Sequence, residues 1–98
     1  MKYTVDYFIK KFTAIPNRLW HTGTIIKDSE GRTCALGHCG GYNTTESKAL
    51  NNHFRTAFDV TADCVNDNDY DGKSLKSGRL PKNRILNALE LIKMGVKV

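Results

Sequence analysis

The sequence has no apolar segment long enough to act as a secretory signal or to cross a membrane. A signal peptide needs an apolar core near its start, but the first residues here lead directly into an amphipathic stretch. A membrane-spanning helix needs about 20 predominantly apolar residues in succession. These absences predict a cytoplasmic protein with no membrane association.

Cysteine is scarce, and its number is odd. The three cysteines are Cys34, Cys39 and Cys64. Without an export signal, we expect all of them to be reduced thiols rather than disulfides. The 98 residues are enough to bury one modest core without covalent cross-links. Residues 1–98 are therefore expected to form a single domain.

Aromatic residues are absent from residues 71–98, where Lys and Arg outnumber the acids. The net charge of +5 and this basic end make Arg79, Lys82 and Arg84 candidate phosphate contacts for a nucleic acid. Single-strand recognition usually adds aromatic rings for base stacking. No P-loop and no G-x-G-x-x-G motif occurs. A solvated helix face that balances the acidic stretch before it is the simpler interpretation.

Apolar residues recur at helical spacing in three stretches. The first predicts a helix over residues 4–14, with Thr4 as its N-cap and Pro16 beyond its end. A second helix is expected to start after Asn43 or Thr44, and a third to begin at Pro81. Six apolar side chains of these helices are expected to meet in one core: Phe8, Phe12, Phe54, Phe58, Leu89 and Ile92.

Residues 19–36 have the composition of a β-hairpin. Aromatic and β-branched residues come first, and residues 27–32 then form a turn signal with a glycine near its end. A helical turn is expected near Thr33, and residues 63–78 are expected to be irregular. The predicted class is α+β: three main helices around one core, with a short β-hairpin between the first two helices. The alternative is an all-helical fold in which residues 19–36 are irregular.

The segment Cys34-Ala-Leu-Gly-His38 is the strongest catalytic candidate. In a helix Cys34 and His38 would stand at i and i+4, and their side chains would face each other. A cysteine in the first turn of a helix and near an imidazolium has a lowered pKa, which makes it nucleophilic. The simpler interpretation is that Cys34 is a small buried apolar residue, and we favour it.

Two metal sites are suggested by the sequence, and neither is complete. Residues 67–72 match the start of a calcium loop, D-x-D-x-D-G, but the twelfth position is Gly78 where a bidentate glutamate is required. A structural zinc site needs two pairs of ligands at regular spacing. Cys34, His38 and the adjacent Cys39 form one such cluster, but the other candidates, His53 and Cys64, are single residues. We therefore expect no metal and no cofactor.

Several segments together resemble a group of small, uncharacterised proteins from phages and bacteria. The segments are Ile15-Pro16, Leu19-Trp20, Thr22-Gly23-Thr24, Gly31-Arg32, Cys34-Ala-Leu-Gly-His38, Val65-Asn66-Asp67 and Pro81-Lys-Asn-Arg84-Ile85-Leu86. The resemblance covers most of the chain and implies a bacterial or phage cytoplasm. Small phage proteins often bind a host factor, a defence enzyme or its nucleotide signal. The resemblance brings no activity and no residue roles.

The same segments contain polar residues that would form a pocket if the fold brings them together. The candidate catalytic residues are Cys34, His38 and Asn66, a trio known from other folds. The candidate ligand-binding residues are Trp20, His38, Tyr42, Asn66 and Asp67. The first functional hypothesis is a small non-enzymatic binding or inhibitor protein that acts on a host factor or a nucleotide signal. The alternatives are a cysteine-dependent hydrolase or transferase and a nucleic-acid-binding accessory protein; the sequence leaves the oligomeric state open.

Overall fold

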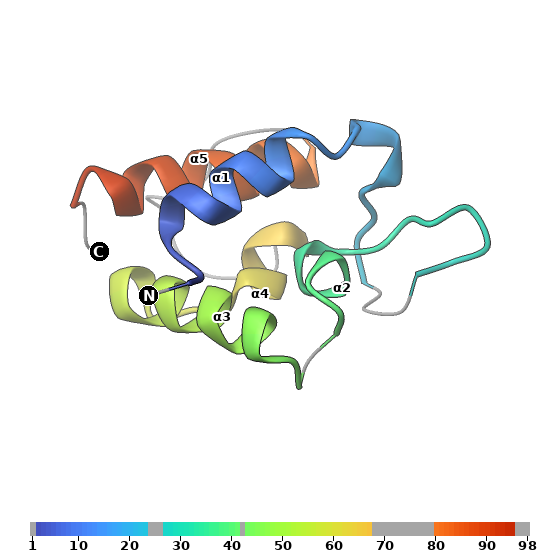
Figure 1. Cartoon of the computed structure of the whole chain (residues 1–98). Helices are drawn as coiled ribbons and strands as arrows, with labels where there is room; N and C mark the ends of the chain where they lie inside the picture. Colours follow the sequence, from blue (N-terminus) through green and yellow to red (C-terminus); the bar gives the residue numbers. More distant parts are fainter. Residues whose placement is uncertain (1, 24–26, 42, 68–79, 96–98) are drawn as a thin grey trace.

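The computed structural model describes residues 2–23, 27–41, 43–67 and 80–95, and its helices form two layers (Figure 1). In one layer α1 (Val5–Thr13) and α5 (Pro81–Lys93) lie side by side. The other layer contains α3 (Thr45–Phe58) and α4 (Ala62–Asp67). The short α2 (Ala35–His38) packs against α4, and a 3-10 helix, η1 (Asn17–Leu19), follows α1.

The first predicted helix is confirmed as α1. The hydroxyl oxygen of Thr4 accepts a hydrogen bond from the Tyr7 backbone N–H at 3.1 Å, which caps the helix. Asp6 lies in the first turn, where its negative charge faces the positive end of the helix dipole. Phe8 and Phe12 are the buried residues of this helix, as the apolar spacing predicts.

The other two predicted helices are confirmed as α3 and α5. Of the two predicted caps of α3, the structure uses Thr44, whose hydroxyl oxygen accepts from the Ser47 N–H at 3.0 Å. Asp59 ends α3 in a left-handed conformation with φ of 60°. Pro81 occupies the first turn of α5, where its missing N–H costs no hydrogen bond.

The predicted β-hairpin, and with it the α+β class, is wrong. Among the described residues the pairing in this region is a single isolated bridge between Trp20 and Thr33, and its direction is parallel. The turn at residues 28–32 is instead closed locally, because the Asp28 carboxylate accepts from the N–H groups of Glu30 and Arg32. The chain then enters α2 directly after Cys34, which leaves no room for a return strand. The described chain fits the helical alternative.

Helix α4 is a second correction, because residues 63–78 were expected to be irregular. Its first N–H, on Ala62, donates to the Asn51 side-chain oxygen of α3 at 2.8 Å. Its C-terminal carbonyls, on Val65 and Asn66, accept from the Arg84 guanidinium of α5. Both ends of α4 are thus satisfied by side chains from distant segments, which local sequence does not reveal. Residues 68–79 lie outside the described residues.

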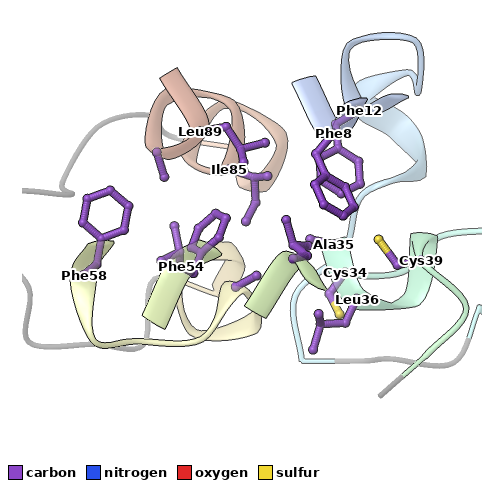
Figure 2. Packing of buried hydrophobic residues seen from close by; sticks show 14 of the residues in the cluster. Phe8, Phe12, Cys34, Ala35, Leu36, Cys39, Phe54, Phe58, Ile85 and Leu89 are labelled. Carbon is purple, nitrogen blue, oxygen red and sulfur yellow. The ribbon is translucent and has the colours of Figure 1, made fainter. Parts of the chain in front are cut away.

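The core lies between the two helical layers, and side chains from α1, α3 and α5 point into it (Figure 2). Five of the six predicted core residues are buried, and Ile92 is partly buried and packs against them. The five are Phe8, Phe12, Phe54, Phe58 and Leu89. In the described part of the chain, no helix has the length and apolarity to cross a bilayer.

Candidate functional site

The segments that carry the predicted site residues do meet in the fold. Helix α2, with His38 at its end, packs against α4, where Asn66 and Asp67 form the last turn. The Trp20 ring lies beside the His38 ring, with 4.9 Å between the ring centroids. Tyr42, the remaining predicted ligand contact, lies outside the described residues.

Asn66 is fully buried, and its side chain is bonded to three parts of the chain. Its oxygen accepts from the Ala35 N–H at the start of α2 at 3.1 Å. Its amide nitrogen donates to the His21 carbonyl at 2.9 Å and to the Asp67 carboxylate at 2.8 Å. A buried amide with these partners holds α2, α4 and the 20–23 segment together, and it has little capacity left for a ligand.

Arg84 is buried and reinforces the same region from α5. Its side chain donates to the Val65 carbonyl at 3.2 Å and to the Asn66 carbonyl at 2.5 Å. A cation at the C-terminal end of α4 is also favoured by the helix dipole. Of the three proposed phosphate contacts, Arg84 is therefore inaccessible, Lys82 donates to the Thr13 carbonyl at 3.1 Å, and Arg79 lies outside the described residues.

His38 is held in place by a hydrogen bond from its ring. Its Nε2 lies 3.0 Å from the Leu19 carbonyl oxygen, which can only accept, so Nε2 must carry the hydrogen. Burial lowers the pKa of His38, although this hydrogen bond opposes the shift in part. The ring therefore links α2 to the segment before Trp20.

The buried thiols of Cys34 and Cys39 are poor nucleophiles in this fold. Cys34 is only 1% exposed, and burial raises its pKa above the ordinary thiol value despite a partial lowering by nearby backbone N–H groups. Burial also raises the pKa of Cys39 to about 12, with the Glu46 carboxylate adding to the effect. Figure 2 shows both sulfur atoms among core side chains. Within the described ranges, no group of three or more His, Cys, Asp or Glu side chains is placed to hold a metal ion.

A polar groove of about 430 Å³ lies on α3, away from this buried region. Lys48, Asn51, Asn52 and Arg55 line it from α3. The remaining wall comes from the residues on either side of that helix: Asn43, Thr61 and Asp63. The size is in the range of small-molecule sites, which is roughly 300–1,000 Å³.

The groove was not predicted from the sequence, although the spacing of polar residues in α3 indicates part of it. The four α3 residues stand at i, i+3, i+4 and i+7, which is the spacing of one helix face. They form a polar stripe beside the buried apolar stripe of Leu50 and Phe54. The other wall depends on α4 starting at Ala62, which was not predicted.

The two regions differ in what they can do chemically. The side chains around Asn66 are buried and bonded to the chain itself, whereas Lys48, Asn52 and Arg55 reach solvent. The cations and amides of the groove can bind a polar anion, whereas its one carboxylate, on Asp63, repels an anion. Comparison of the chain with protein-family models, curated proteins and solved structures finds no match.

Proposed function

We propose that this protein is a non-enzymatic binding or inhibitor protein that acts on a nucleotide signal or a host factor in a bacterial or phage-infected cytoplasm. The main support for the proposal is the burial and hydrogen bonding of the three candidate catalytic residues. Cys34 is buried with a raised pKa, His38 has a lowered pKa and is bonded to Leu19, and Asn66 is bonded to Ala35 and His21. Each of these groups is thus packed in the core or hydrogen-bonded to another segment of the chain.

A cysteine hydrolase or transferase needs a different arrangement. Its thiol must be accessible and deprotonated near neutral pH, with a base that receives the proton and an oriented third group. Burial opposes the first requirement at Cys34, because it hides the thiol and raises its pKa. The hydrogen bond to the Leu19 carbonyl fixes the His38 ring as part of the fold. The enzyme hypothesis is therefore less favourable than the binding hypothesis.

The nucleic-acid hypothesis is also weakened. It depends on a row of accessible cations on α5, but Arg84 is buried and Lys82 is engaged at the end of α1. The groove on α3 instead gathers its cations and amides in one confined place. Such a place suits a small anionic ligand better than an extended strand.

A binding experiment coupled to product analysis tests the proposal. The protein is mixed with adenosine and guanosine mono-, di- and cyclic phosphates; binding is followed by the shift in melting temperature, and the nucleotides are recovered by chromatography. We expect at least one nucleotide to raise the melting temperature and every nucleotide to be recovered unchanged. Turnover that disappears in Cys34→Ser or His38→Gln, with both variants folded, would instead establish the enzyme.

A further inference from the structure

We infer that the α3 groove is the ligand site and that it takes a nucleotide with two separated phosphate groups. Lys48 and Arg55 would each hold one phosphate, and the amides between them would hold the nucleoside. This inference rests on the proposed function, because it names the place and the ligand class of that binding. It is based on one face of α3, where Lys48 and Arg55 lie at opposite ends of a polar stripe and two asparagines lie between them.

The two groove cations are not used by the described fold. Lys11, Arg32 and Lys93 each form an ion pair with a carboxylate. Lys48 and Arg55 are exposed, and neither has an ion-pair partner among the described residues. Both side chains can therefore turn toward a ligand without breaking a contact of that part of the structure. Hydrogen bonds from Lys or Arg to phosphate are among the stronger ones in proteins.

The spacing of the cations sets the shape of the ligand. Lys48 and Arg55 are seven residues apart, which is two helical turns and about 10 Å along the axis. A single phosphate cannot sit close to both residues unless both long side chains bend toward the middle of the groove. A ligand with an anionic group near each end meets both cations in extended conformations. A nucleoside 3′,5′-bisphosphate is the simplest nucleotide of this kind.

The middle of the groove suits the polar edge of a base. The Asn51 oxygen already accepts from the Ala62 N–H, which leaves its amide nitrogen as a donor. Asn52 is exposed and offers both a donor and an acceptor. The carboxylate of Asp63 lies on the opposite wall of the groove. Its charge disfavours a phosphate at that wall, which orients the ligand along α3.

Calorimetric titration with defined nucleotides tests this inference. The probes are adenosine 3′,5′-bisphosphate, adenosine 5′-monophosphate, adenosine and inorganic phosphate, all at one ionic strength; guanosine forms of the same series test the base. We expect the bisphosphate to bind at least tenfold more tightly than the monophosphate, and adenosine and phosphate alone to bind weakest. Lys48→Ala and Arg55→Ala should each lower bisphosphate affinity about tenfold, the loss expected for one charge-assisted contact.

The matched control is Lys10→Ala, which removes one exposed lysine on α1 and changes the net charge equally. We expect it to leave the affinity within twofold, and far-ultraviolet circular dichroism should show all variants folded. Bisphosphate binding that neither groove variant weakens, or that Lys10→Ala weakens equally, would overturn the site while leaving the binding function intact. Equal affinity for bisphosphate and monophosphate would overturn the two-phosphate ligand. Chemical turnover would instead refute the proposed non-enzymatic function.

Discussion

Phe8→Ala is expected to lower the free energy of unfolding by about 4 kcal/mol, as large-to-small changes of buried aromatics do. The Phe8 side chain is fully buried in the layer of α1 and α5. Its ring stacks on Phe12 at 5.8 Å and meets the Tyr7 ring edge-on at 5.1 Å. Removing it takes away apolar burial and leaves a cavity that the neighbouring rings cannot fill.

Urea unfolding followed by circular dichroism measures this change. Because domains of this size are stable by roughly 5–15 kcal/mol, the Phe8→Ala variant should unfold at a much lower urea concentration or be partly unfolded in buffer. Phe8→Leu is the graded control and should lose roughly 1 kcal/mol, because most of the side-chain volume is kept. Lys10→Ala on the exposed face of α1 should change stability by less than about 0.5 kcal/mol. A Phe8→Ala variant as stable as Lys10→Ala would show that α1 does not pack as described.

Asn66→Ala is expected to lower the free energy of unfolding by about 3 kcal/mol. The change leaves the buried Ala35 N–H without its partner, at a cost of about 1–3 kcal/mol, and also removes the part-buried hydrogen bond to the His21 carbonyl. The shorter side chain also leaves a void where Asn66 was fully buried. The loss should appear as a lower midpoint in the same urea experiment.

Asn83→Ala is the matched control, because it makes the same change at an exposed position on α5. Its effect should remain within about 0.5 kcal/mol. The comparison separates a structural role from a catalytic one. A catalytic or purely ligand-binding asparagine would lose function and leave stability close to that of Asn83→Ala, and this result would contradict the structural role.

The helices α1, α3 and α5 were predictable because local signals agree with packing. Each has an apolar stripe at helical spacing, and Thr4, Thr44 and Pro81 mark the starts. The hairpin prediction was wrong because a turn signal such as that of residues 27–32 also suits a loop that its own side chains close. Asp28 closes that turn, and no local pattern distinguishes it from a strand connection.

The candidate site was only partly predictable, for a related reason. The segments of Cys34, His38 and Asn66 meet, but sequence does not show that the fold itself occupies their hydrogen-bonding groups. That outcome depends on partners such as Leu19 and Ala35. The groove on α3 required knowledge of α4, whose two ends are satisfied by side chains distant in sequence.

We propose that Cys34, His38 and Asn66 hold the fold together and do not perform chemistry. The rate of iodoacetamide alkylation at Cys34, measured by peptide mass spectrometry as a function of pH, tests it most directly. The half-exposed Cys64 is the internal reference, because its thiol is more accessible in the same molecule. His38→Gln, which keeps an amide donor for the Leu19 carbonyl, tests whether His38 contributes.

We expect Cys34 to react at least tenfold more slowly than Cys64 at pH 7, because alkylation requires an accessible thiolate. The raised pKa of Cys34 means that its rate should keep rising above pH 9 and show no plateau near neutrality. His38→Gln should leave the rate at pH 7 unchanged in the folded protein. Rapid alkylation of Cys34 at pH 7 that His38→Gln suppresses without unfolding would contradict the account and make the protein a cysteine enzyme.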